Sequence, residues 1–361
     1  MQKRTDGRTR LVRWTGLLIL SAIFVSALTL AHLPAALLLG PMLAAIVFAA
    51  TEKTVHVSSR LIAIAQGLIG CMIAKSIPLS ILGEIAKDWP IFVAGVVSVL
   101  LAATSLGWLL AKFQVLPGTT AIWGAMPGGA SAMVIMSESF GADMRLVAFM
   151  QYLRIVCVAI AASTISRIWV EKTGAPLPQT IWFPPIAWLP MAETAALIAA
   201  SIVLTKWLKI PAGVFILPMI GGMILQNTGM IDMELPPWLL AAGYALLGWA
   251  IGVRFSRDIL RHAARALPQV FGSIIALIAI CGVFAAILVT VADIGPLTAY
   301  LATSPGGVDS VAIISASSDV DMPFVMAMQL ARLMVILLAG PALARLVVKW
   351  SGIADQPPHS R

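Results

Sequence analysis

One stretch of this chain occurs twice, and both copies interrupt segments that are otherwise apolar. The first copy has Pro127 followed by two glycines, and the second has Pro305 followed by two glycines. Proline within a helix lacks an amide donor and clashes with the preceding turn, while glycine favours an open backbone. In a membrane such a break is tolerated only where it is buried in protein or lines a cavity. The two breaks are therefore the first place to look for function.

The repetition extends beyond the breaks to nearly the whole chain. Pro127 and Pro305 differ by 178 in residue number, and the same offset relates further pairs, which are Asp143 with Asp321, Gln151 with Gln329, and Arg154 with Arg332. Upstream, the apolar run 34–48 matches the run 211–225, with prolines at positions 1 and 8 of each. The two halves are thus copies of one element.

The composition is that of a membrane protein. Hydrophobic residues make up 60% of the chain and charged residues only 11%, whereas soluble domains carry about a quarter charged residues. The net charge of +8 does not indicate nucleic-acid binding, because the basic residues lie mostly in short segments between apolar runs, where membrane topology explains them. The three cysteines are far apart within apolar segments, so neither a disulfide framework nor a thiolate metal site is predicted.

We predict an all-α polytopic membrane protein built from two inverted repeats. Each repeat has about five transmembrane helices and one re-entrant or broken helix at the Pro-Gly-Gly element. The expected parts are membrane repeat 1 (14–168), a connector (169–190), membrane repeat 2 (191–347), and cytoplasmic tails at 1–13 and 348–361. The first apolar run could also be a cleavable signal peptide, but its match with the run 192–208 favours a membrane helix.

The distribution of basic residues predicts that the two halves are inverted. In the first half, Lys53 and Arg60 lie in the loop after the second apolar segment, and the next loop has no net charge. In the second half the order is reversed, since four arginines lie in the later loop, at Arg254, Arg257, Arg261 and Arg265. By the positive-inside rule, this predicts ten spanning helices with both termini inside and breaks that enter from opposite faces.

The doubled Pro-Gly-Gly element, the GADMR and DVDMP stretches that follow it, and the Q-x-x-R of each half resemble the AbrB family of bacterial inner-membrane proteins. Members are labelled transcriptional regulators or ammonia monooxygenases, and the first label derives from an effect on the expression of another gene. The family's distant similarity to sodium/proton antiporters and bile-acid symporters implies transport. The second half departs from the first where Pro323 replaces Arg145 and Asp309 replaces Ser131, which argues against identical roles for the two breaks.

The breaks themselves supply the first set of candidate site residues. A short helix is expected to begin after each pair of glycines, and the amide groups at its start favour an anion or a polar substrate group. The candidates are Gly128, Gly129, Ser131, Gly306, Gly307, Asp309 and Ser310. For the two serines, helix capping and substrate contact both stay open. For Asp309, a carboxylate at membrane depth, we favour the binding of a coupling proton or sodium ion.

The second set of candidates lies on the long apolar segment after each break. Gln151 with Arg154, and Gln329 with Arg332, are three residues apart and share a helical face near mid-membrane. A charge at that depth is costly unless it is paired or faces water. Two alternatives are open: a structural salt bridge, with Glu138 as the nearest partner for Arg154, or contact with an anionic substrate.

We therefore expect an ion-coupled secondary transporter of a small polar or anionic solute, embedded in the lipid bilayer of a bacterial inner membrane. The alternative is a membrane sensor that affects gene expression without transport. A monooxygenase is disfavoured, because it needs clustered metal ligands and the four histidines are widely separated. No catalytic residue, metal, cofactor or nucleic-acid partner is predicted, and a homodimer is left open.

Overall fold

The computed structural model consists of helices joined by turns and irregular links in the residues that it describes. These are residues 7–351 except 32, 34, 53–54, 77–82, 84–86, 88, 114–115, 117, 128–132, 134–136, 138–141, 174–181, 209–212 and 265. No strand occurs among them, which confirms the predicted all-α class. The helices of the first half are α1 (Gly7–Leu30), α2 (Ala36–Ala50), α3 (Ser59–Ser76), α5 (Trp89–Lys112), α6 (Gly118–Ala125) and α8 (Met144–Thr173). Those that follow are α9 (Trp188–Leu208), α10 (Gly213–Asn227), α11 (Pro237–Gly252), α12 (Arg257–Ala263), α13 (Leu267–Ala292), α14 (Pro296–Thr303), α15 (Val308–Ala316) and α16 (Met322–Ser351).

The sequence duplication is also seen in the positions at which the helices begin and end. The short helices α6 and α14 begin and end at positions that differ by 178, and so do the long helices α8 and α16. Helices α5 and α13 begin at the same offset. The local signals that start and stop each helix are therefore repeated along with the sequence.

The chain folds into two compact units, and each unit takes helices from both halves of the sequence. The first unit comprises Met1–Leu79 with Ser163–Arg257, and the second comprises Ser80–Ala162 with Asp258–Arg361. The first therefore holds the opening three helices of each half, and the second holds both breaks. The predicted repeats, 14–168 and 191–347, are units of sequence and do not coincide with these compact units.

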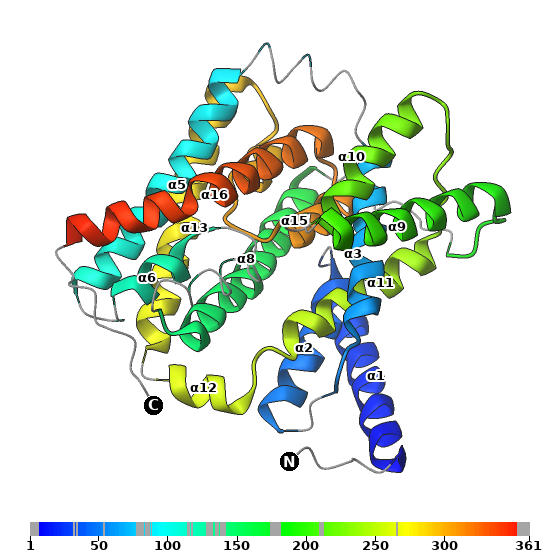
Figure 1. Cartoon of the computed structure of the whole chain (residues 1–361), viewed down its shortest axis with the longest axis horizontal. Helices are drawn as coiled ribbons and strands as arrows, with labels where there is room; N and C mark the ends of the chain where they lie inside the picture. Colours follow the sequence, from blue (N-terminus) through cyan, green and yellow to red (C-terminus); the bar gives the residue numbers. More distant parts are fainter. Residues whose placement is uncertain are drawn as a thin grey trace. The chain divides into compact units, whose positions relative to one another are not determined.

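In the first unit, the two halves pack on each other in a reciprocal way. Helix α2 packs on α11, and its counterpart α10 packs on α3 (Figure 1). A β-carbon placed at Gly248 would lie 2.6 Å from the carbonyl oxygen of Leu38, and one at Gly70 would lie 2.6 Å from that of Phe215. Glycine at these two equivalent positions thus lets the helix backbones approach closely.

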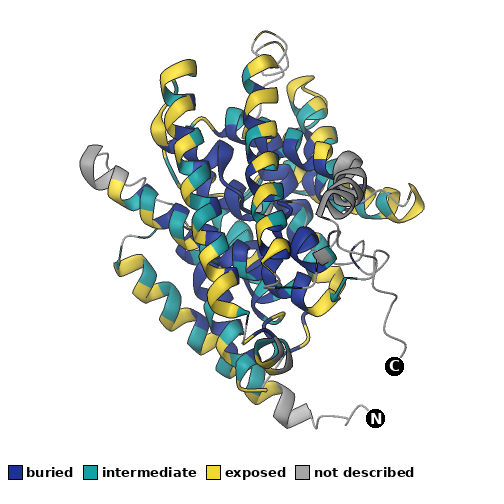
Figure 2. Cartoon of the chain, turned by 90° about the vertical axis from the view of Figure 1, so that its left-hand side faces the viewer, coloured by how far each residue is buried: buried dark blue, intermediate teal, exposed yellow. Residues whose placement is uncertain are grey.

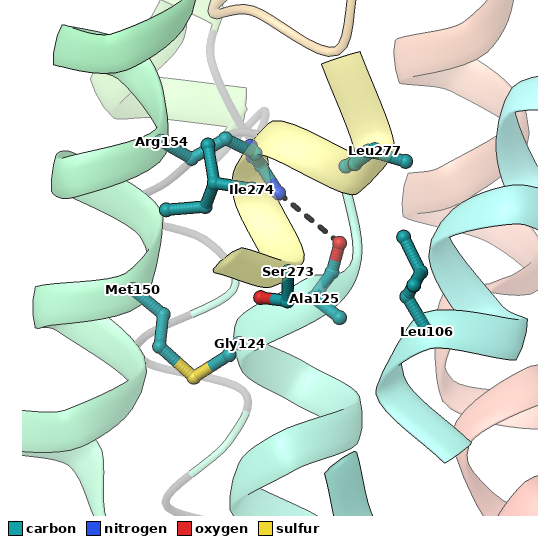
Figure 3. A pocket seen from close by; sticks show the side chains of 8 residues that line it. All are labelled: Leu106, Gly124, Ala125, Met150, Arg154, Ser273, Ile274 and Leu277. Carbon is teal, nitrogen blue, oxygen red and sulfur yellow. Dashed lines mark hydrogen bonds between the residues drawn. The ribbon is translucent and has the colours of Figure 1, made fainter. Parts of the chain in front are cut away.

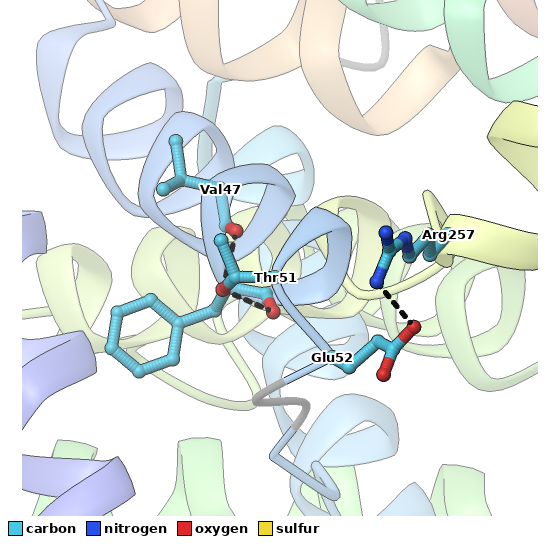
Figure 4. Close-up of polar contacts among 5 residues, drawn as sticks. Val47, Thr51, Glu52 and Arg257 are labelled. Atoms are coloured by element: carbon cyan, nitrogen blue, oxygen red, sulfur yellow. Dashed lines mark hydrogen bonds and ion pairs between the residues drawn. The ribbon is translucent and has the colours of Figure 1, made fainter.

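Polar contacts stabilise the chain where α2 ends, and one of them involves a residue of the second half. The hydroxyl of Thr51 donates to the carbonyl of Val47, and the Arg257 guanidinium lies 2.9 Å from the Glu52 carboxylate (Figure 4). Thr228, which follows α10, donates to the carbonyl of Ile224 in the same way. Both sides of the Glu52–Arg257 pair are well exposed, so it contributes little stability.

Large apolar residues are exposed on several helices. Figure 2 shows exposed positions in yellow along much of their length. On α13, for example, Val283, Ile287 and Val291 are each more than half exposed. Within the described residues, five helices are long and apolar enough to cross a membrane, and they correspond to α1, α5, α8, α9 and α13. Shorter apolar helices are Ala36–Ala50, Gly213–Asn227, Pro237–Gly252 and Met322–Ile336. The exposed apolar surface suits lipid contact.

Candidate functional site

The second break is a gap between two short buried helices of the second unit. Helix α14 ends at Thr303, Ser304 is extended, and Gly307 is the N-cap from which α15 begins. This confirms that a short helix begins after the second pair of glycines. In the first half, α6 ends at Ala125 and Pro127 follows it, whereas Gly128, Gly129, Ser131 and Glu138 lie outside the described residues.

In the first half, the predicted Gln151 and Arg154 bind the end of α6. The Nε2 amide of Gln151 donates to the carbonyl oxygens of Trp123 and Met126, each at 2.9 Å. Arg154 Nη1 donates to the carbonyls of Ala125, at 3.2 Å, and Met126, at 2.9 Å, while its Nη2 donates to Gln151 Oε1 at 2.8 Å. Both side chains are almost fully buried. The pair thus satisfies carbonyls that a helix end leaves without amide partners.

The second half repeats this arrangement for the glutamine, whereas the arginine has partly different partners. Gln329 Nε2 donates to the carbonyls of Leu301, at 2.7 Å, and Ser304, at 3.2 Å, which stand 178 residues after the partners of Gln151. Arg332 Nη1 donates to the carbonyl of Ser304, but its Nη2 donates to the carbonyl of Gly306, at 2.8 Å, and not to the neighbouring glutamine. Both described partners of the Arg332 guanidinium are therefore backbone carbonyls at the second break.

Sequence reasoning missed this role for the two arginines. A positive side chain at the C-terminal end of a helix is favoured by the helix dipole, and charged donors make the stronger hydrogen bonds. The described partners of both arginines are carbonyls and one glutamine, with no carboxylate among them. The signal that could have found this role is the fixed spacing between each break and its Q-x-x-R.

The paired aspartates identified by the repeat are helix caps. Asp143 and Asp321 directly precede α8 and α16, and their Oδ1 atoms accept amide hydrogens of Leu146, at 3.3 Å, and Phe324, at 3.0 Å. This is the arrangement expected of an aspartate N-cap. Their own amides donate to the hydroxyls of Thr120 and Thr298, which lie in the two short helices. Each cap therefore ties a long helix to the short helix before its break.

Each long helix of the second unit also contacts the other half of the chain. A β-carbon at Gly307 would lie 3.6 Å from Ile155, and one at Gly306 would lie 3.0 Å from Val158, both of which are in α8. In the other direction, Ile336 of α16 packs in a buried cluster with Ile122 and Trp123 of α6. Each long helix thus binds the break of its own half through polar groups and packs against the other half through apolar ones.

Comparison of the sequence with known proteins identifies the family of the chain. The sequence model described as "Transition state regulatory protein AbrB" matches residues 9–348. The chain belongs to the AbrB family. It is 45% identical over 337 residues to a protein of Escherichia coli (strain K12) named "Putative regulator AbrB", covering 93% of this chain and 97% of that one. It is also 26% identical over 308 residues to "Uncharacterized protein YhjN" of Bacillus subtilis (strain 168), covering 81% of this chain and 79% of that one.

In this AbrB family member, several buried polar groups at the breaks have no hydrogen-bond partner in the described part of the chain. They are Nε of Arg154, Nε of Arg332 and Oε1 of Gln329. Arg154 also lines a small cavity of about 20 Å³ enclosed by Leu106, Ala125 and Ser273 (Figure 3). Each of the two buried arginines thus keeps one donor, its Nε, without a partner among the described residues.

The remaining predicted residues, Ser310 and Asp309, lie near the second break. Ser310 is buried, and its hydroxyl would be 3.6 Å from a β-carbon at Gly307. The N-cap of α15 is Gly307, so Ser310 does not occupy the N-cap position. Asp309 lies in α15, and its side chain is outside the described part. Among the residues that the structure describes, no three His, Cys, Asp or Glu side chains come together as metal ligands.

Proposed function

We propose that this AbrB family protein is an ion-coupled secondary transporter of a small polar or anionic solute in a bacterial inner membrane. The observation that carries the proposal is that α6 and α14 both end at a Pro-Gly-Gly element in one unit, each with its end bound by a buried arginine. Interrupted helices that meet at the centre of a duplicated membrane fold are an architecture of secondary transporters.

The charges at the breaks favour a negatively charged solute. A charge at membrane depth is retained when it faces a partner or a water-filled pathway. Arg154 and Arg332 are almost fully buried, and hydrogen bonds to carbonyls leave their charge without a counter-ion among the described residues. An anionic group bound between the breaks would supply that counter-ion. Asp309 is the carboxylate we assign to proton or sodium coupling.

The finer topology is part of the same proposal. We take the two halves to be inverted repeats with ten spanning helices, in which the Pro-Gly-Gly elements are re-entrant or broken helices that enter from opposite faces. Support comes from the reversed order of the basic loops and from the repeated helix ends of α6 with α14 and α8 with α16. This arrangement would place equivalent residues of the two halves on opposite faces of the membrane.

A second candidate function is a membrane sensor that affects gene expression. The name of the Escherichia coli relative, a regulator, is the observation that favours it. The two proposals separate cleanly, because a sensor would keep its effect on expression in a variant whose flux is abolished. We propose no enzymatic activity for this chain.

The experiment that tests transport is uptake of labelled organic anions by proteoliposomes under a proton or sodium gradient. We expect saturable uptake that depends on one gradient and is lost in Arg332→Gln. The matched control is Arg257→Gln, an exposed arginine whose loss should leave uptake unchanged. Asp309→Asn should retain solute exchange but lose its dependence on the gradient. Uptake equal to that of protein-free liposomes across the panel would contradict the proposal.

A further inference from the structure

The two breaks differ in how far the glutamine and arginine that bind them satisfy each other. In the first half, Arg154 Nη2 donates to Gln151 Oε1 at 2.8 Å, so this pair is closed on itself. In the second half, Arg332 Nη2 donates instead to the Gly306 carbonyl, and Gln329 Oε1 has no hydrogen-bond partner in the described part of the chain. The Gln329 side chain is fully buried. A buried acceptor without a donor destabilises a fold, so this atom requires an explanation.

Other buried polar groups around the second break also have no partner among the described residues. They are the hydroxyl of Tyr300 in α14, the hydroxyl of Ser315 in α15 and Nε of Arg332 in α16. Helices α14 and α15 each pack against α16. With Gln329 Oε1, the three helices at the second break therefore hold donors and an acceptor that no described side chain uses.

Electrostatic contacts indicate that several of these groups lie close together. The thiol of Cys281 in α13 interacts with Arg154, Arg332 and Tyr300. The hydroxyl of Thr303 donates to the carbonyl of Cys281 at 3.2 Å, which holds α13 against the end of α14. The two guanidinium groups are also near enough to repel each other. Their described hydrogen-bond partners include no carboxylate, so a bound anion would be stabilised here.

The sequence duplication shows that much of this polarity is specific to the second half. Subtraction of 178 from a residue number gives the equivalent position in the first half. At four positions around the second break a polar side chain or thiol replaces an apolar one, in the pairs Tyr300 with Ile122, Cys281 with Ala103, Thr303 with Ala125, and Ser304 with Met126. The same helical frame therefore carries more polar side chains at the second break than at the first.

We propose that the second break is the one that binds the solute, and that the solute is a small hydroxylated carboxylate. The inference rests on the proposed transport of an anionic solute and adds the half of the chain and the chemical class. The first break, with its closed glutamine–arginine pair, then serves as a structural support.

The unpartnered atoms define this class of solute. Arg332 Nε is a donor only and suits a carboxylate, whereas Gln329 Oε1 is an acceptor only and needs a donor on the solute. A hydroxyl supplies that donor without charge, and an ammonium group would be repelled by Arg154 and Arg332. The Tyr300 hydroxyl can donate to the carboxylate or accept from the hydroxyl. Because all these atoms are buried, the bound solute is enclosed and must be small.

The first test is equilibrium binding of radiolabelled glycolate, L-lactate and L-malate to the purified full-length protein in detergent. Propanoate and L-alanine serve as competitors, because they replace the hydroxyl of L-lactate by hydrogen and by an ammonium group. We expect L-lactate to bind at least about tenfold more tightly than either, as the solute hydroxyl pairs with a buried acceptor. Equal affinity for L-lactate and propanoate would overturn the proposal, and so would failure of all three hydroxy acids to bind.

The second test is Tyr300→Phe, which removes a hydroxyl that has no described partner. We expect its unfolding temperature to stay the same or rise, while L-lactate binding weakens about tenfold. The matched control is Tyr244→Phe, a buried tyrosine of the other unit whose hydroxyl donates to Met72 Sδ at 2.9 Å. It should lose some stability and bind L-lactate normally. Normal binding by Tyr300→Phe would show that the open groups hold only buried water, which overturns the proposal. If that variant does not fold, the comparison of L-lactate with propanoate decides.

The outcomes separate this inference from the transport proposal. Binding of hydroxy acids that depends on Tyr300, without flux under either gradient, would uphold the site and contradict transport. Gradient-dependent uptake in which propanoate competes as well as L-lactate would uphold transport and overturn the site at the second break.

Discussion

The guanidinium of Arg332 donates a hydrogen bond to the carbonyl of Ser304, and 178 residues earlier Arg154 makes the same bond to the carbonyl of Met126. Each arginine thus caps the C-terminal end of the short helix that precedes the break in its own half of the chain. Since helix ends leave carbonyls without partners, and no water reaches them in the hydrocarbon region, such a break needs internal donors to exist in a membrane. The Q-x-x-R motif supplies them.

Removal of the second of these guanidinium groups should destabilise the protein. In Arg332→Leu the carbonyls of Ser304 and Gly306 lose their donor, and each buried group left unsatisfied costs about 1–3 kcal/mol. We expect a clearly lower unfolding temperature in detergent, with partial recovery in Arg332→Lys. Arg257→Leu, which removes an exposed ion pair, should cost less than about 1 kcal/mol. Equal stability of both leucine variants would contradict the capping role.

Alanine at the helix-packing glycines of the first unit should also destabilise it. A β-carbon at Gly248 or Gly70 would lie 2.6 Å from a backbone oxygen, so the helices must move apart. We expect similar losses from Gly248→Ala and Gly70→Ala, measured by thermal unfolding. At Gly272, nothing lies within 4 Å of the added carbon, so Gly272→Ala should be neutral or stabilise α13 by up to about 1 kcal/mol. A neutral Gly248→Ala would rule out tight packing of α2 on α11.

The orientation of the halves can be tested at two equivalent threonines. Thr51 and Thr228 follow α2 and α10, are exposed, and bond to the preceding turn in the same way. Inverted halves predict that Thr51→Cys lies inside and Thr228→Cys outside. With a membrane-impermeant thiol reagent on intact cells, we expect only Thr228→Cys to react, and Thr51→Cys to react after lysis. Reaction of both from the same side would disprove the inversion.

The two glycines of the second break should respond differently to alanine. A β-carbon at Gly307 meets Ile155 at 3.6 Å, an ordinary contact, whereas one at Gly306 comes within 3.0 Å of Val158 and Val311. We expect Gly307→Ala to keep its unfolding temperature and Gly306→Ala to lose stability. If Gly307 lines the solute site, Gly307→Ala and a bulkier Gly307→Phe should lower uptake progressively in folded protein. Uptake that falls only in proportion to stability would assign this glycine to packing.

The sequence by itself determined the class of the protein and the position of its breaks. Apolar runs and few charges predict membrane helices, because water cannot satisfy backbone groups there, and the Pro-Gly-Gly elements must interrupt them. The 178-residue offset predicted that helix ends would repeat, and α6 with α14 and α8 with α16 confirm it. These features depend on neighbouring residues, so a local pattern suffices to read them.

Only the tertiary structure decided which parts of the two halves fold together. The compact units combine helices from both repeats, and Arg154 finds its partners at Ala125 and Met126, 28 or more residues away. The identity of an arginine shows that it needs acceptors, yet carbonyls, carboxylates and a solute all qualify. Which of these acceptors each arginine meets depends on how helices far apart in the chain pack, and a local sequence pattern does not encode that packing.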